Sequence, residues 1–187
     1  MISSNDLKPG MTIQQDGDIF VVLEQSQNKT ARSAMVVKAK VRNLRTGSNV
    51  ELSWGGGDKI QPARIDKKEM QYLYDTDDAL VFMDNETYEQ IEIPKDHLEW
   101  EINFMKPNDN VMISMFEGEI LGVILPDKVT LQVVECEPAV KGDTATSAQK
   151  NAVVETGLQV KVPLFISQDE MIVINTADGK YSGRSKD

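Results

Sequence analysis

The fold is decided by an alternating stretch, Ala34-Met35-Val36-Val37-Lys38-Ala39-Lys40-Val41-Arg42. Apolar residues lie at 35, 37, 39 and 41, and three of the four alternate positions from 36 to 42 are basic. A period of two predicts a β-strand whose apolar face packs and whose other face presents cations to solvent. Residues 19–23 predict a second strand, and the polar segment 28–33 joins the two. The sequence therefore predicts a hairpin with Lys29 and Arg32 in its connecting segment.

Short strands separated by turn residues are predicted along the rest of the chain. They cover 50–54, 70–74, 79–83, 88–93, 111–116, 120–125, 129–134, 152–155, 158–162 and 171–175. One short helix is predicted over 94–99, with a proline near its start. This spacing favours small β-barrels over alternating strands and helices. Shifts in composition predict three all-β units, residues 1–64, 65–128 and 129–187.

The charge of the chain is unevenly distributed. The net charge is −10, yet residues 1–64 carry nine Lys or Arg and six Asp or Glu, whereas residues 65–128 carry five and sixteen. No acidic residue lies between Asn28 and Val50, a stretch with six cations. A basic end on an acidic chain indicates a phosphate-bearing partner such as RNA. A solvated strand face that is merely cationic is the alternative.

No constellation of catalytic or metal-binding residues is predicted. The chain has one histidine, His97, for which the sequence offers no triad partner. It has one cysteine, Cys136, which excludes an intramolecular disulfide. Residues 55–60 superficially resemble a phosphate loop but lack the G-x-x-x-x-G-K-[ST] spacing, so they predict a hairpin turn. We expect no enzyme activity, no metal and no cofactor. The absence of a basic start followed by an apolar stretch predicts a cytoplasmic chain with no membrane partner.

Several separate stretches resemble one known family, bacterial translation elongation factor P. The tip hairpin of that family is similar to 28–38, Asn-Lys-Thr-Ala-Arg-Ser-Ala-Met-Val-Val-Lys, which runs into 41–47. Further similar stretches are 81–84 with 88–93, 137–144, 154–166 and 175–181. The resemblance runs the full length of the chain, which is identified as a member of this family.

The resemblance implies a fold and a function. The fold would be an L-shaped, tRNA-like arrangement of a KOW/SH3-like barrel followed by two OB-folds. The family implies binding to the 70S ribosome, beside peptidyl-tRNA and between the peptidyl and exit sites, and relief of stalling at consecutive prolines. Proline reacts poorly because its ring fixes φ and stiffens the nascent end, and the factor would contribute positioning of the tRNA acceptor end. We expect a monomer.

The tip departs from the commonest form of the family, which carries Pro-Gly-Lys with a modified lysine. Here Thr30-Ala31-Arg32 stands in its place. The sequence resembles the subgroup whose tip arginine receives a rhamnose, so we expect Arg32 to carry one, added by an arginine rhamnosyltransferase. A sugar would lengthen the reach and add hydroxyls while the guanidinium stays charged. A bare arginine that touches tRNA phosphate is the alternative.

The charge pattern and the resemblance together predict a set of RNA contacts beside Arg32. The predicted set is Lys29, Thr30, Ala31, Ser33, Lys38, Lys40, Arg42, Arg45, Gly142, Asp143, Thr144, Tyr181 and Arg184. Small residues over 142–144 would allow close backbone approach to RNA near the exit-site codon. An alternative function is a single-stranded RNA or oligosaccharide-binding OB-fold module without a ribosomal role. It predicts exposed aromatic residues gathered on one strand face.

Overall fold

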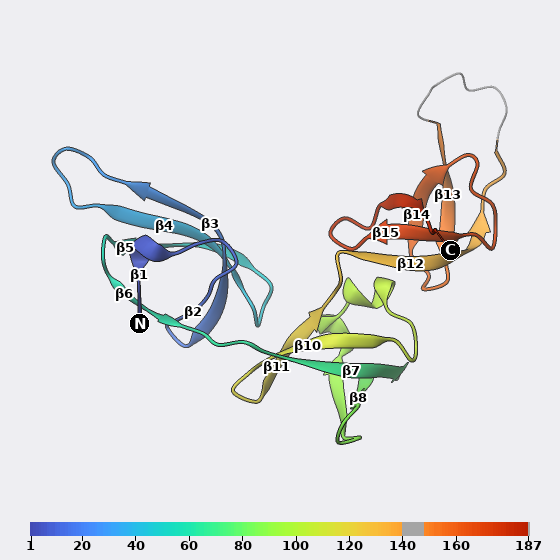
Figure 1. Ribbon diagram of the computed structural model, residues 1–187, viewed down its shortest axis with the longest axis horizontal. Coiled ribbons are helices and arrows are strands. Elements are labelled where there is room, and N and C mark those ends of the chain that lie inside the picture. The colour runs from blue at the N-terminus through green and yellow to red at the C-terminus, as the bar shows by residue number, and fades with distance from the viewer. Residues whose placement is uncertain (140–147, 187) are drawn as a thin grey trace. The chain divides into compact units, whose positions relative to one another are not determined.

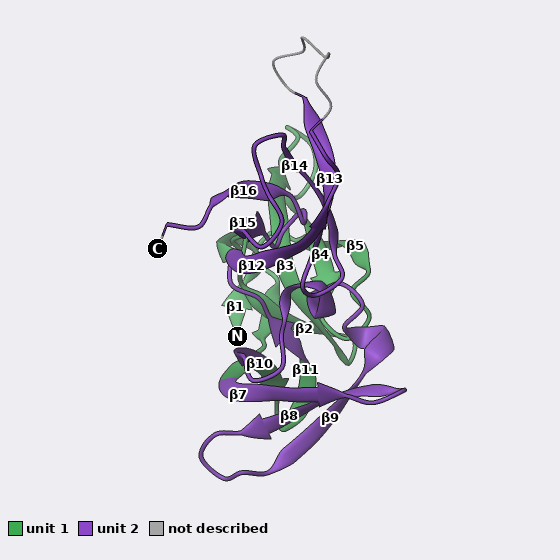
Figure 2. Ribbon diagram, turned by 90° about the vertical axis from the view of Figure 1, so that its right-hand side faces the viewer, with its two compact units in different colours: residues 1–67, 114–121 green, residues 68–113, 122–187 purple. Residues whose placement is uncertain are grey.

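The computed structural model describes residues 1–139 and 148–186, and its chain forms two compact units. Figure 2 distinguishes them by colour: residues 1–67 with 114–121 form unit 1, and residues 68–113 with 122–187 form unit 2. The predicted all-β class is confirmed, because three antiparallel sheets account for the regular structure apart from three short 3-10 helices in the described ranges. The prediction of three domains divided at 64/65 and 128/129 stays a prediction.

The first sheet lies in unit 1 and has the order β1-β6-β2-β3-β4-β5 (Figure 1). Its strands are β1 (Ile2–Ser3), β2 (Thr12–Gln15), β3 (Asp18–Asn28), β4 (Val36–Asn43), β5 (Asn49–Gly55) and β6 (Lys59–Pro62), with the 3-10 helix η1 (Ser4–Asp6) after β1. The alternation predicted for β4 is confirmed: Val37, Ala39 and Val41 are at most 2% exposed, and the residues between them are exposed. Ala39 and Val41 pack with Ile13 and Phe20 in the core.

The second sheet has the order β11-β10-β7-β8-β9. Its strands are β7 (Asp66–Asp75), β8 (Ala79–Asp84), β9 (Gln90–Pro94), β10 (Asn110–Phe116) and β11 (Glu119–Ile124). The tip of the β10–β11 hairpin, residues 114–121, belongs to unit 1. There Phe116 and Leu121 pack with Ile19 and Ala63 in an apolar cluster.

The third sheet has the order β14-β13-β12-β15-β16 and lies in unit 2. Its strands are β12 (Lys128–Cys136), β13 (Gln149–Val154), β14 (Gln159–Pro163), β15 (Met171–Asn175) and β16 (Tyr181–Arg184). The core of this sheet takes in Phe104 from the 3-10 helix η3 (Glu101–Phe104). Two hydrogen bonds hold the same segment: Trp100 Nε1 donates to the Thr176 carbonyl at 2.9 Å, and Thr156 Oγ1 donates to the Asn103 carbonyl at 2.6 Å.

The structure departs from the sequence predictions in a few elements. The helix expected over 94–99 is a single 3-10 turn, η2 (Lys95–His97). The strand expected from Tyr88 begins only at Gln90, because Tyr88 has a φ of 59° in the left-handed region. β1, β2, β6 and β16 were not predicted; each has at most four residues and too few apolar positions to show a period. Within the described residues, no helix is long and apolar enough to cross a membrane.

Candidate nucleic-acid interface

The outer ends of β3 and β4 form a two-stranded projection, which we call the finger (residues 26–38). Its strands pair in register from Asn28–Val36 inwards, and Figure 1 shows the connecting segment extending beyond the other strands of unit 1. β5 accompanies β4 only as far as the Val36–Gly55 pair. At the base of the finger Val37 is fully buried, so the projection grows directly out of the packed barrel.

The tip of the finger is exposed and presents two cations. All residues from 28 to 34 are exposed, including Lys29 and Arg32. The Ser33 amide donates to the Thr30 carbonyl at 3.3 Å, and the hydroxyls of these two residues are hydrogen-bonded to each other, so the tip is a closed turn. No hydrogen bond or ion pair joins Arg32 to any residue that the structure describes. The guanidinium is therefore available to an external acceptor.

The cations along β4 are partly neutralised by acids on the neighbouring strands. Lys40 Nζ lies 3.1 Å from Glu24 Oε2 on β3, and Lys38 Nζ lies 3.8 Å from Glu51 Oε1 on β5. Arg42 Nε donates to Asn49 Oδ1 at 3.1 Å, which leaves its charge uncompensated. The positive charge that seemed continuous in the sequence is thus strongest at the tip.

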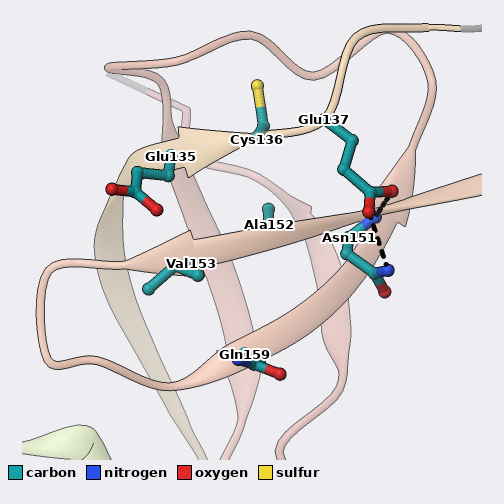
Figure 3. A pocket seen from close by; sticks show the side chains of 7 residues that line it. All are labelled: Glu135, Cys136, Glu137, Asn151, Ala152, Val153 and Gln159. Carbon is teal, nitrogen blue, oxygen red and sulfur yellow. Dashed lines mark hydrogen bonds between the residues drawn. The ribbon is translucent and has the colours of Figure 1, made fainter.

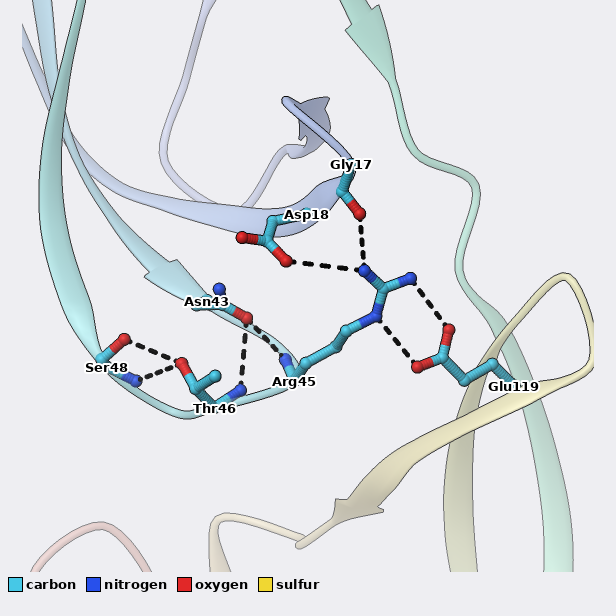
Figure 4. A network of polar contacts seen from close by, with 7 residues as sticks. All are labelled: Gly17, Asp18, Asn43, Arg45, Thr46, Ser48 and Glu119. Carbon is cyan, nitrogen blue, oxygen red and sulfur yellow. Dashed lines mark hydrogen bonds and ion pairs between the residues drawn. The ribbon is translucent and has the colours of Figure 1, made fainter.

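Arg45, one of the predicted RNA contacts, makes several contacts within unit 1, and its RNA contact stays a prediction. Its guanidinium makes two parallel hydrogen bonds of 2.9 Å to the Glu119 carboxylate and donates to the Gly17 carbonyl at 2.6 Å (Figure 4). Asp18 Oδ1 lies 3.5 Å from Nη1. The hydrogen bond with Glu119 raises the pKa of Arg45 and lowers the pKa of Glu119. Because four of its five N–H groups face these acceptors, Arg45 fastens the 114–121 hairpin tip within unit 1.

The predicted contacts in the C-terminal sheet are only partly described. Gly142, Asp143 and Thr144 lie outside the described residues. Tyr181 is half-buried against the apolar core of this sheet. Arg184 stacks 4.6 Å from the centre of the Phe165 ring and lies 3.1 Å from Glu170 Oε1, so its charge is already paired. These residues remain predictions as RNA contacts.

A surface hollow of about 410 Å³ lies beside Cys136 (Figure 3). Glu137 accepts two hydrogen bonds of 3.1 Å there, from the backbone amide and the side-chain amide of Asn151. The backbone bond is the main cause that lowers the pKa of Glu137. The thiol of Cys136 points away from this pair, and the histidine of the chain, His97, lies on η2. The hollow therefore lacks a partner that would activate the thiol among the described residues.

Comparison with known proteins gives the family. Family models match three consecutive parts of the chain: the elongation factor P KOW-like domain over 3–60, the elongation factor P OB domain over 65–123, and the elongation factor P C-terminal region over 129–184. The chain is 52% identical over 187 residues to elongation factor P from Mesoplasma florum, with 99% of this chain and 100% of that one covered. The chain belongs to the elongation factor P family.

Further similar proteins support the assignment to this family and the fold. The protein of that name from Mycoplasma mycoides subsp. mycoides SC is 52% identical over 186 residues, covering 98% of this chain and 100% of its own. A solved eukaryotic translation initiation factor 5A from Methanococcus jannaschii is similar with a TM-score of 0.54 and 22% identity, over 66% of this chain and 94% of that one. This structural likeness supports the fold, a KOW-like barrel followed by OB domains.

The finger and its tip were predicted from the sequence, whereas the acids that limit the charge of the finger were not. Glu24 and Glu51 face Lys40 across two strand pairs, which the register of the hairpin could have indicated. Glu119 lies 74 residues from Arg45, and no local pattern signals that pairing. Among the predicted contacts at the tip, Lys29 and Arg32 are cations without an acidic partner in the part of the chain that the structure describes.

Proposed function

We propose that this chain, as a translation elongation factor, binds the 70S ribosome beside peptidyl-tRNA and places Arg32 at the tRNA acceptor end. The observation that carries the proposal is the tip itself, an exposed guanidinium with no partner among the described residues. A guanidinium forms two hydrogen bonds to a phosphate in one plane, which fixes orientation as well as contact. Lys29 adds a second cation, and Thr30 and Ser33 supply hydroxyls beside it.

The protein's contribution to the reaction would be positional. The acyl end of a prolyl peptidyl-tRNA is stiff because the ring fixes φ, so the reacting groups align poorly. A cation held against the acceptor end restricts that misalignment, and alignment alone can change a rate by orders of magnitude. Peptide-bond chemistry stays with the ribosome, which is why the chain needs no catalytic residue of its own.

We further propose that Arg32 carries a rhamnose added by an arginine rhamnosyltransferase, and that the chain acts as a monomer. The exposure of Arg32 on a closed turn supports access by a modifying enzyme. The mass of the tryptic peptide that covers Arg32, from protein purified from its native cells, tests this. An added deoxyhexose supports the modification. An unmodified mass refutes it and leaves the contact by a bare arginine.

A reporter that encodes a run of prolines, translated in a purified system, tests the function. Wild-type protein should relieve the pause, and Arg32→Ala should relieve it far less. Asp77→Ala, an exposed change in the β7–β8 turn, is the control and should behave as wild type. Equal relief by wild type and Arg32→Ala would refute the proposal.

The OB-fold module without a ribosomal role would require exposed aromatic residues on one strand face. The exposed aromatic residues in the described ranges are Tyr74, Tyr88, Trp100 and Phe165. They come from the end of β7, the β8–β9 turn, the segment before η3 and the β14–β15 loop. Trp100 also packs edge-on against Phe104 at 5.1 Å. This arrangement favours the translation factor.

A further inference from the structure

The base of the finger needs support that its own strands do not supply. Beyond Val22, where β3 still exchanges hydrogen bonds with the segment Gly10–Met11, the described partner of β3 is β4 alone. β4 loses its second neighbour at the Val36–Gly55 pair. A two-stranded ribbon is only marginally stable by itself. The direction of the tip therefore depends on what holds the two strands where they leave the barrel.

The glycine-rich turn at residues 55–58 holds the β4 side. The Gly56 amide donates at 2.7 Å to the carbonyl of Met35, the residue that precedes β4, one position beyond the Val36–Gly55 pair. A Cβ at position 56 would lie 2.9 Å from Met35 Cβ and 3.2 Å from Met35 O. Gly57 differs: its φ is 86° and its Cβ direction is open. Gly57 therefore serves the turn conformation, whereas Gly56 permits close contact with the finger.

The helix η1 holds this turn and the β3 side together. Ser4 is fully buried; its Oγ donates to the Gly55 carbonyl at 2.8 Å and accepts from the Gly57 amide at 3.1 Å. The Ser4 amide donates to the Asp58 carbonyl at 2.8 Å. The next carbonyl, that of Asn5, accepts from Gln27 Nε2 on β3 at 3.0 Å. One short helix thus contacts both sides of the finger base.

We propose that η1 and the turn 55–58 form a clamp that sets the direction of the finger, with Gly56 and Gln27 as positioning residues. The turn 55–58, whose sequence superficially resembles a phosphate loop, would instead support the segment that carries Arg32. The clamp itself stands on the contacts above, and its importance for translation rests on the proposed function. If residues 55–58 formed only an ordinary hairpin turn, changes there would affect the barrel and leave the direction of the tip unchanged.

Distance measurement between two spin labels tests the clamp. Cys136→Ser removes the one native cysteine, and Ser33→Cys and Arg64→Cys place labels at the tip and on the exposed chain after β6 in the same unit. The parent should give one narrow distance distribution. Gly56→Ala and Gln27→Met should each shift or broaden it.

Gln14→Met is the matched control, because Gln14 Nε2 makes the same kind of exposed bond, to the Pro62 carbonyl at 3.2 Å, away from the finger. It should leave the distribution unchanged. If Gly56→Ala fails to fold, Gln27→Met decides. The clamp proposal would be overturned if both clamp variants gave the distance distribution of the parent. It would also be overturned if Gln14→Met changed the distribution as much as they do.

A second measurement separates the clamp from the proposed function. In the proline-run reporter, unlabelled clamp variants should lower the maximal relief by up to about tenfold, since small misplacements of a reacting group are costly. The concentration that gives half the effect should stay near wild type, because the binding surface is intact. If the parent protein does not relieve the pause in the reporter, the proposed function is refuted. The spin-label distances test the clamp independently of that result.

Discussion

Replacing Glu24 by glutamine should strengthen binding of this chain to ribosomes that carry peptidyl-tRNA. Glu24 Oε2 lies 3.1 Å from Lys40 Nζ, and the two side chains are 70% and 63% exposed. An exposed pair of this kind is worth about 0.2–1 kcal/mol. If the freed lysine interacts with phosphate instead, the dissociation constant should fall by at most about fivefold, since 1.4 kcal/mol corresponds to about tenfold.

The salt dependence of binding makes this prediction sharper. Each phosphate contact contributes about 0.7–0.9 to the slope of log K against log salt, so Glu24→Gln should steepen the slope by up to about one contact. Lys29→Gln should make it shallower, because Lys29 has no acidic partner in the described structure. Titration of labelled factor against ribosomes at several salt concentrations measures both. Weaker binding by Glu24→Gln, or an unchanged slope for Lys29→Gln, would refute the assignment of the finger as the phosphate-facing surface.

Three further results are expected. Phe104→Ala should lower the free energy of unfolding of unit 2 by about 3–5 kcal/mol in urea titration, because Phe104 is 3% exposed in the C-terminal core; a loss below about 1 kcal/mol would contradict that packing. The hydrogen bond from Lys68 lowers the pKa of Asp84 to about 2. The stability that this carboxylate contributes is therefore complete above pH 3.8 and is lost as pH falls through about 2. Lys68→Met should make the unfolding midpoint less dependent on pH over that range. Arg45→Met with Glu119→Met should destabilise unit 1 by less than the sum of the two single changes, since both remove the same ion pair.

The local parts of the fold could be predicted from sequence. β4 combines a strict period of two with branched apolar residues, and both signals indicate the same strand. Strands of the core in the other sheets, such as β8 and β15, were predicted because continuous or alternating apolar runs between turns are unambiguous at that length. η2 was predicted as a longer helix because the proline signal marks a start without specifying where the helix ends.

The long-range parts of the site could not be predicted. Within the clamp, Ser4 contacts Gly55 and Gly57, which lie 51 and 53 positions away, and no periodic pattern encodes such a contact. The turn 55–58 was predicted as a turn, but the reason for a glycine at 56 is the approach of Met35, which only coordinates provide. Charge in sequence also overstated the basic surface, because strand register determines which acid faces each lysine.

Photo-crosslinking from the tip tests the central claim most directly. A photoreactive amino acid at position 32, in factor bound to ribosomes stalled on a proline run, reports what the tip touches. The account predicts crosslinks to the acceptor end of the peptidyl-tRNA, and none to that tRNA end from the same group at Asp77, an exposed residue of the β7–β8 turn. Crosslinks from position 32 that miss the tRNA, or equal yields from the two positions, would contradict it.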